Sequence, residues 1–209
     1  MLSLHQSTGT VDPDSIRIVT PRLLLRALRP GDLFPLAEVA NDAEISRWTT
    51  TVPHPYTVGD AAKWIMLSRS LLAAGDGLPL AVVLGQTLST ADGRSHAAGT
   101  LVAMAGLILT KTQPRAELGY WVGRDFRSLG IASEAAGAVI DYGFGTLGLA
   151  RIFAGYFDGN EGSERVMRRV GMTAEGVRRC EARKDGVAVD INGYAITRSD
   201  WQARRQGPA

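Results

Sequence analysis

The chain has 209 residues, of which 45% are hydrophobic and 21% are charged, so it has the composition of an ordinary globular protein and the length for one well-buried core. Its 23 basic and 21 acidic residues leave a net charge of only +2, which gives no strong field toward nucleic acid or an anionic membrane. The single cysteine, Cys180, excludes an internal disulfide and a cysteine-based zinc cluster and fits a reducing cytoplasm.

The ends of the chain differ from its middle. Residues 1–15 have neither the basic start nor the apolar centre of a signal peptide, so we expect a flexible lead-in. Residues 16–201 form one predicted domain, because no linker rich in Pro, Gly or Ser divides them, and residues 202–209 form a tail. No run reaches the roughly 20 apolar residues that a membrane helix needs, so we expect a soluble, cytoplasmic protein.

The predicted elements begin with a strand over 17–28, a helix over 30–41 that Asp32 would cap, and a longer amphipathic helix over 57–74. Strands over 78–86 and 97–108 follow, joined by a polar turn over 87–95, and a third strand spans 115–123. A helix over 131–147, a strand over 150–157, a short helix over 160–170 and a hairpin over 173–197 complete the domain. Strands that first meander and then alternate with helices predict an α/β protein with a mixed sheet and helices on its faces.

The hexad Arg127-Ser128-Leu129-Gly130-Ile131-Ala132 joins the third of these strands to the following helix. A helix N-terminus after a loop of small residues offers unpaired N–H groups and a partial positive charge, which suit a pyrophosphate. Gly130 and Ala132 keep large side chains away from that anion, and Arg127 can add a charge-assisted hydrogen bond. The hexad also fits a capped helix that binds nothing. A nucleotide site is disfavoured, because the chain lacks the Gly-x-Gly-x-x-Gly fingerprint and a P-loop lysine.

The segment 117–136, ELGYWVGRDFRSLGIASEAA, resembles the coenzyme A-binding segment of the GCN5-related N-acetyltransferases (GNAT), particularly the branch of ribosomal-protein alanine and serine N-acetyltransferases. That superfamily carries Arg or Gln, two variable residues, Gly, one variable residue, then Gly or Ala, and Arg127, Gly130 and Ala132 stand at those positions. The segment 160–167, NEGSERVM, resembles the branch's Asn-x-x-Ser block, and residues 20–26 and 194–201 resemble its first and last strands.

The resemblance implies the GNAT fold, a central, mostly antiparallel sheet of about seven strands that splays at the cofactor site and carries helices on both faces. It implies acetyl-CoA as cosubstrate and no metal. The hexad would hold the pyrophosphate, and backbone groups of Tyr120, Trp121 and Val122 would pair with the pantetheine arm as a neighbouring strand would. Asn160 would hold the pantetheine amides, or serve only as a helix N-cap. Arg165, Arg168 and Arg169 could reach the adenosine 3′-phosphate, or form a solvated helix face.

The chemistry implied by the resemblance is direct attack of an amine on the acetyl thioester. Glu117 is the first candidate for the general base, although it could equally pair with Arg115 at the sheet edge. Glu181 is the second candidate and Asp190 the third. The oxyanion would be held by a backbone N–H near Val122.

The leaving thiolate needs a proton, and Ser163 is the residue expected to supply it. Its alternative role is a first-turn helix residue that bonds local backbone. Tyr156 and Tyr194 are other possible donors, although strand tyrosines more often serve packing.

Trp48 and Tyr56, in an apolar stretch after the first predicted helix, are candidate acceptor contacts or core residues. The three histidines are scattered without the spacing of metal ligands, so no zinc site is expected. A homodimer is common in the branch, but the sequence carries no interface signal.

We therefore predict an acetyl-CoA-dependent N-acetyltransferase whose acceptor is a protein or peptide α-amine. Two alternatives remain. The acceptor could be a small amine, such as an antibiotic, a polyamine or an amino acid, or the protein could be an acyl-CoA-binding regulator without catalysis.

Overall fold

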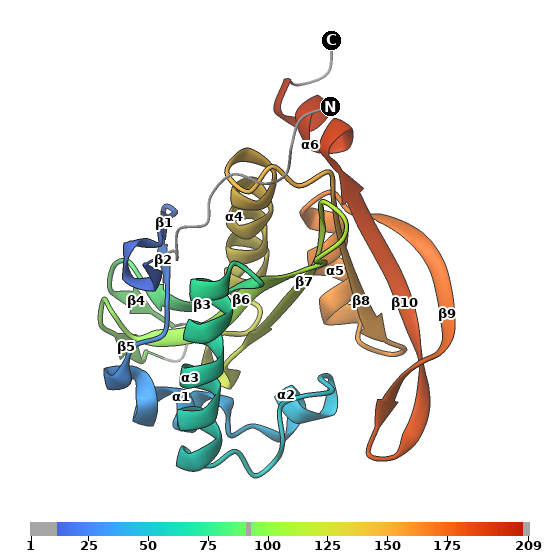
Figure 1. Cartoon of the computed structure of the whole chain (residues 1–209). Helices are drawn as coiled ribbons and strands as arrows, with labels where there is room; N and C mark the ends of the chain where they lie inside the picture. Colours follow the sequence, from blue (N-terminus) through green and yellow to red (C-terminus); the bar gives the residue numbers. More distant parts are fainter. Residues whose placement is uncertain (1–11, 91–92, 207–209) are drawn as a thin grey trace.

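The computed structural model describes residues 12–90 and 93–206 (Figure 1). Its strands are β1 (Arg17–Val19), β2 (Leu23–Arg26), β3 (Gly77–Leu84), β4 (Leu88–Ser89), β5 (Ser95–His96), β6 (Leu101–Leu109), β7 (Arg115–Val122), β8 (Arg151–Phe157), β9 (Thr173–Lys184) and β10 (Val187–Thr197). Its α-helices are α1 (Leu33–Ala40), α2 (Ala43–Arg47), α3 (Val58–Ala74), α4 (Ile131–Gly145), α5 (Glu161–Arg169) and α6 (Arg198–Gln206). Short 3-10 helices are η1 (Pro13–Ser15), η2 (Pro30–Asp32) and η3 (Arg124–Phe126).

Eight strands form one sheet in the order β1-β2-β3-β6-β7-β8-β10-β9, and β4 and β5 form a separate short pair. Neighbours in the large sheet are antiparallel except β7 and β8, which run parallel and are connected through α4. A parallel pair needs such a crossover, whereas antiparallel strands can be joined by tight turns. The prediction of a mixed, mostly antiparallel sheet is confirmed, with eight strands in place of about seven.

Helices cover both faces of this sheet. On β3, Leu80 and Val82 pack into the apolar cluster that contains Phe144 of α4, whereas Ala81 and Val83 pack into the cluster formed with α1 and α3. Successive strand residues point to opposite faces, so β3 is buried along its whole length. The result is three layers, with α4 on one face and α1 and α3 on the other (Figure 1).

Two predictions near the N-terminus are wrong in detail. The strand expected over 17–28 is two strands, β1 and β2, which pair with each other after a turn closed by the Thr20 N–H to Leu23 O hydrogen bond. The helix expected over 30–41 divides into η2 and α1, and Asp32 does not cap α1 with its side chain. Its carboxylate instead accepts hydrogen bonds from Arg26, at 2.7 Å, and from the Arg29 N–H.

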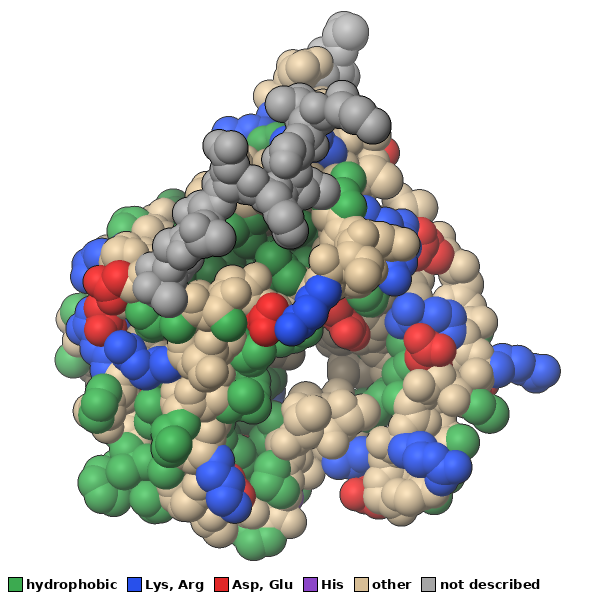
Figure 2. All heavy atoms as spheres, viewed as in Figure 1, with side chains coloured by type: hydrophobic (Ala, Val, Ile, Leu, Met, Phe, Trp, Pro, Cys, Tyr) green, Lys and Arg blue, Asp and Glu red, His purple; other side chains and the backbone are tan. Residues whose placement is uncertain are grey.

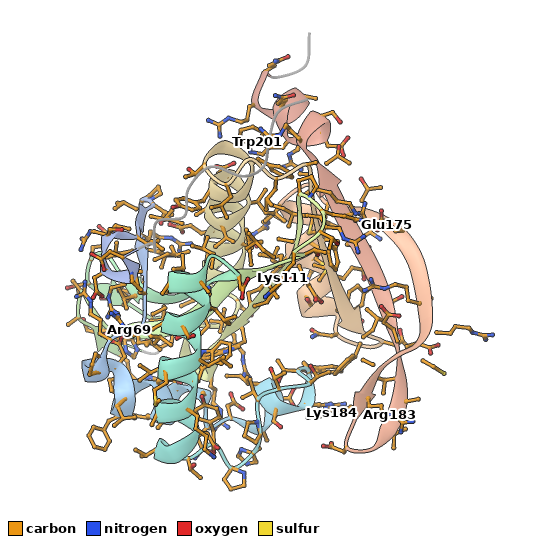
Figure 3. The ribbon with its side chains drawn as sticks, viewed as in Figure 1. Arg69, Lys111, Glu175, Arg183, Lys184 and Trp201 are labelled. Atoms are coloured by element: carbon orange, nitrogen blue, oxygen red, sulfur yellow. The ribbon has the colours of Figure 1, made fainter. Side chains whose placement is uncertain are left out.

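The chain ends also differ from expectation. Residues 1–11 of the predicted lead-in lie outside the described residues. Residues 13–15 form η1, and Asp14 of η1 pairs with Arg69 of α3 at 2.9 Å. The predicted tail over 202–209 is wrong as far as Gln206, because α6 continues to that residue. Trp201 holds α6 to α4 by donating its indole N–H to Asp141 at 2.6 Å, beside the tilted ring of Phe144 (Figure 3).

The last two strands form a long hairpin that curves away from the rest of the sheet (Figure 1). It turns at Asp185-Gly186, as predicted, and both residues have positive φ, at 50° and 81°. The register shifts between Val189 and Ile191, which marks a bulge that bends the hairpin. Its curvature leaves a hollow between the hairpin and the N-terminal half of the sheet.

Candidate active site

A cleft of about 1480 Å³ occupies that hollow. Its walls come from α2 and α3 on one side, from β7 and the start of α4, and from β8, α5 and the β9–β10 hairpin on the other side. Figure 2 shows the hollow between the two halves of the molecule. Almost all of the residues predicted for the site line it, from segments up to 133 residues apart in the sequence, Trp48 to Glu181.

The cleft exists because β7 and β8 separate after only three paired residues. Their parallel register runs from Arg115 opposite Arg151 to Glu117 opposite Phe153. Beyond that point β7 stays paired with β6 as far as Val122, and β8 stays paired with β10 as far as Phe157. The backbone edge of β7 that faces β8 therefore has no paired strand at Tyr120, Trp121 and Val122, and these residues line the cleft. An extended amide-bearing chain can occupy this slot as a strand would.

The loop before α4 is held in a conformation that few residues adopt. Ser128 and Gly130 both have positive φ, at 62° and 78°, and Gly130 is the N-cap residue of α4. A Cβ atom on Gly130 would lie 3.4 Å from the Arg22 guanidinium, so a side chain there is strained and crowded. Ala132 and Ser133, in the first turn of α4, line the cleft, and the N–H groups of a first turn have no partner within the helix.

Arg22 and Glu134 lock this loop to the N-terminal segment. Arg22 donates to Leu129 O at 2.9 Å and to the Glu134 carboxylate at 2.6 Å, and Thr20 donates to the same carboxylate at 2.6 Å. Burial would raise the pKa of Glu134, but the hydrogen bonds from Thr20 and Arg22 lower it below its usual value. The carboxylate therefore stays charged in the first turn of α4, where a negative charge stabilises the helix.

The hexad residues divide into two groups. Ile131 is buried in the core, and Leu129 packs against it, so these two side chains anchor the loop. Ser128, Gly130 and Ala132 line the cleft and give a bound phosphate access to the backbone. This arrangement suits a pyrophosphate, whose binding at the loop stays a prediction.

Arg127 lies elsewhere than expected. Its guanidinium donates to the Asp42 carboxylate, which is buried, and to Val122 O at 3.4 Å. Asp42 also caps α2 by accepting the Glu44 N–H at 3.0 Å. In this structure Arg127 thus joins the loop to α2, and its role as a phosphate ligand stays a prediction.

A second recess of about 720 Å³ continues from the loop toward α6. Ser128, Gly130, Ser133 and Arg169 line both hollows, and Arg204 lines the second one. Of the three arginines considered for a 3′-phosphate, only Arg169 lines this recess. Arg165 and Arg168 also make ion pairs along α5, with Glu161 at 3.2 Å and Glu164 at 2.7 Å.

Glu117 stands where β7 and β8 begin to separate. Its side chain is open to water in the cleft but flanked by protein, and this burial raises the pKa of Glu117, with Arg178 opposing and Glu181 adding to the effect. Pairing with Arg115 is not observed, because the Arg115 guanidinium lies over the Phe153 ring, 5.7 Å from its centroid. A carboxylate with a raised pKa, facing a cleft, suits a general base.

The other two candidate bases have different surroundings. Glu181 lines the cleft and lies 3.8 Å from Arg178. Asp190 accepts the Cys180 N–H at 2.8 Å across the hairpin, which gives it a structural role.

Ser163 and Tyr120 meet across the cleft floor. The two hydroxyl oxygens are 2.9 Å apart, and the Tyr120 hydroxyl is also 3.1 Å from Ser163 O. Burial raises the pKa of Tyr120 to about 12, so its hydroxyl keeps its proton at any physiological pH. Ser163 is therefore half of a hydroxyl pair in which either residue could pass on a proton.

Asn160 caps α5, since its side-chain oxygen accepts the Ser163 N–H at 3.1 Å, and it also lines the cleft. Tyr194 is less suited to proton donation, because its hydroxyl already donates a hydrogen bond to Glu164 at 3.0 Å. The Tyr194 ring also contacts the ring of Tyr156.

The two aromatic candidates for acceptor contact differ in burial. Trp48 is half-buried, lines the cleft and donates its indole N–H to Glu44 at 3.0 Å. A Cβ atom on Gly159 would lie 3.6 Å from the Trp48 ring, so α2 reaches the β8–α5 loop across the cleft. Tyr56 is only 9% exposed and belongs mainly to the N-terminal apolar cluster.

Sequence reasoning missed several residues at the site. Asp42 was not considered, although it is an acid at a helix N-terminus, where such residues are favoured. Tyr120 was considered for its backbone alone, and Arg178 was not considered. Their partners are distant in the sequence, since Ser163 stands 43 positions after Tyr120, and only the folded chain shows the contacts.

Within residues 12–90 and 93–206, no three His, Cys, Asp or Glu side chains come together as a potential metal site. Over the same ranges no helix is both long and apolar enough to cross a bilayer.

Comparison with known proteins agrees with this geometry. Residues 22–173 match the model of the acetyltransferase (GNAT) domain. The chain is 26% identical over 191 residues to a Bacillus subtilis protein named putative ribosomal N-acetyltransferase YdaF, covering 90% of this chain and 97% of that one. It is 39% identical over 90 residues to the uncharacterized N-acetyltransferase YoaA of Bacillus subtilis, which covers 43% of this chain and only 51% of YoaA.

Among solved structures, RimJ of Mycobacterium smegmatis in complex with CoA-disulfide superposes with a TM-score of 0.71 at 22% identity, covering 90% of this chain and 85% of that one. The family match over residues 22–173 includes the splayed strands β7 and β8 and the loop at the start of α4. The chain therefore belongs to the GNAT acetyltransferase family and is an acetyl-CoA-dependent N-acetyltransferase.

Proposed function

We propose that the acceptor is the α-amine at the N-terminus of a protein or peptide. The observation that carries the proposal is the position of Glu117, a carboxylate with a raised pKa on the wall of a wide cleft. An α-amine has a pKa of roughly 7.7 to 8, so much of it is neutral at cell pH and a weak base is sufficient. The cleft is larger than the roughly 300–1,000 Å³ of typical small-molecule sites, which leaves room for a chain beside the pantetheine arm.

In this proposal the amine nitrogen attacks the thioester carbon while Glu117 accepts an amine proton, directly or through one water. The carbon–sulfur bond then breaks, and the thiolate takes a proton through the Ser163–Tyr120 hydroxyl pair, which regains one from water. A backbone N–H on the free edge of β7, between Glu117 and Val122, stabilises the oxyanion. The name of the Bacillus subtilis relative, a ribosomal N-acetyltransferase, supports an acceptor of this kind.

The test is acetyl transfer to matched peptides that begin with Ser or Ala, with the α-amine free or blocked, read by mass spectrometry. The proposal expects one acetyl group on the free α-amine and none on the blocked peptide, even when that peptide contains lysine. Transfer to lysine side chains, or to small amines but not to any peptide, would contradict it.

A further inference from the structure

Arg178 of β9 lies on a floor made of glycines. Gly155 of β8 is opposite Gly193 of β10, which in turn is opposite Gly176 of β9. A Cβ atom on Gly155 would lie 3.0 Å from the Arg178 Nη2, and one on Gly193 would lie 3.6 Å from its Nε. The guanidinium therefore rests against the sheet, and larger residues beneath it would push it out into the cleft.

The N–H groups of this guanidinium lack good hydrogen-bond acceptors. Its closest acid is Glu181, at 3.8 Å, which is too long for a hydrogen bond. Its Nε is shielded from solvent and has no hydrogen-bond partner among the described residues. A shielded N–H without an acceptor is costly, so the arrangement is favourable when the charged group gains oxygen ligands. The side chain is 38% exposed, and it lines the cleft.

The position of Arg178 relates it to the base. Glu117 is opposite Phe153 on β8, and Gly155, under Arg178, is two residues further along the same strand and so on the same face. The positive charge of Arg178 lowers the pKa of Glu117, against the larger effect of burial. An acceptor amine at Glu117 thus has a guanidinium beside it. A plain alkylammonium would be repelled there, whereas an amine with a carbonyl oxygen next to it gives the guanidinium an acceptor.

We propose that Arg178 binds the carbonyl oxygen adjacent to the acceptor amine, so that the enzyme selects amines of the α-aminoacyl type over simple alkylamines. This inference rests on the proposed α-amine function and specifies how that amine is recognised. The Arg178 guanidinium binds the first carbonyl oxygen while Glu117 accepts the amine proton. Together these two contacts fix the direction of the amine relative to the thioester.

The experiment compares Arg178→Met and Arg178→Lys with Arg179→Met. Arg179 is the next residue on β9, exposed and outside the cleft lining, so it is a matched control for charge and strand position. Three acceptors are used with each enzyme: a Ser-initiated peptide, serinamide, and an analogue of the peptide whose first carbonyl is replaced by a methylene group. KM and kcat are measured on the high-pH plateau, where the base is fully ionised.

Arg178→Met should raise KM roughly 10- to 100-fold for the peptide and for serinamide, the loss expected when a charged hydrogen bond is removed. It should leave the methylene analogue, already a poor acceptor for the wild type, nearly unchanged. Arg178→Lys should restore part of the loss, and Arg179→Met should have no effect. The Kd of coenzyme A, measured by calorimetry, should be the same in all four proteins.

Equal losses for the carbonyl and methylene acceptors would overturn the inference, as would an unchanged KM or a loss that appears in kcat alone and disappears at higher pH. The last result would mean that Arg178 only adjusts Glu117. If the wild type acetylates serinamide with this dependence but never a peptide, the peptide function is wrong and the inference stands. If the wild type prefers the methylene analogue, or acetylates none of the three and binds none in the presence of coenzyme A, both are wrong.

Discussion

Glu117 and Glu181 are the residues whose roles can be separated most directly, because both face the cleft and only one needs to be the base. If Glu117 is the base, Glu117→Gln should lower kcat about 10²- to 10⁴-fold, the usual contribution of such a group. Glu181→Gln should instead keep the activity and move the acid limb of kcat/KM to lower pH. The sign follows because the Glu181 charge raises the pKa of Glu117, and removing that charge lets Glu117 lose its proton earlier. A pH–rate profile checks this, and loss of activity in Glu181→Gln would transfer the role to that residue.

The Ser163–Tyr120 hydroxyl pair gives a second prediction at this scale. If the two hydroxyls act as one proton relay, Ser163→Ala and Tyr120→Phe should each lower kcat by roughly 10-fold or more, and the double variant should lose little beyond the larger single loss. The measurement is a double-mutant cycle in kcat with acetyl-CoA saturating. Losses that simply add would show that the 2.9 Å contact is structural.

The sequence predicted which residue types gather at the site better than it predicted their partners. The hexad and Ser163 were found because their spacing is local, and spacing survives in a linear sequence. Arg127 was expected at a phosphate, and its pairing with Asp42, 85 residues away, was not foreseen, because a buried carboxylate needs a cation and the sequence does not reveal which one is near.

Among the elements, the start of α4 depends most on a distant segment. The Arg22–Glu134 contact at 2.6 Å and the Arg22 bond to Leu129 O hold the loop whose backbone would receive the pyrophosphate. Glu134→Gln should therefore raise the Kd of coenzyme A about 10-fold, with little change in the KM of the acceptor. Calorimetry measures the change.

The control is Lys111→Gln, which breaks an exposed pair with Asp76 at 3.2 Å, and neither residue lines the cleft or the second recess. An exposed pair contributes little, so its Kd should change by less than about 2-fold. Equal effects of the two variants would contradict the assigned role of the Arg22–Glu134 lock.

Long elements were predicted well and short ones poorly. The helix expected over 57–74 is α3, with a Thr57–Asp60 capping box at its start and Gly75, at φ 68°, after its end. The five residues of α2 were missed, because a single turn shows no periodicity and this one is held by Asp42 and its arginines. β1 and β2 were predicted as one strand because both are apolar, and only their pairing with each other shows that they are two strands.

At the scale of the whole molecule, coenzyme A should act as a clamp between the two halves of the sheet. They share three residue pairs between β7 and β8, and the ligand slot lies where further pairs are missing. Binding to the native state at 100 times Kd adds about 2.7 kcal/mol. For a chain of this size that should raise Tm by roughly 5–10 °C.

Scanning fluorimetry at several coenzyme A concentrations checks this prediction. ATP offers phosphates without the pantetheine arm and should raise Tm less. A Tm that does not change when coenzyme A is added, or that rises equally with ATP, would contradict a ligand bound between the strands.

The splayed strands also form a wedge that is closed at one end. The slot narrows toward the last pair, Glu117 opposite Phe153, which lies five residues, or roughly 17 Å along β7, from Val122 at the wide end. If a thioester enters from the wide end, it can go no deeper than this pair, so we expect the slot to limit the length of the acyl group. An acyl chain longer than acetyl has no further depth available and must turn toward Glu117 and Arg178, the place of the acceptor. Longer acyl-CoA molecules should thus bind and compete with the amine, and chain-length selection would be enforced by the second substrate.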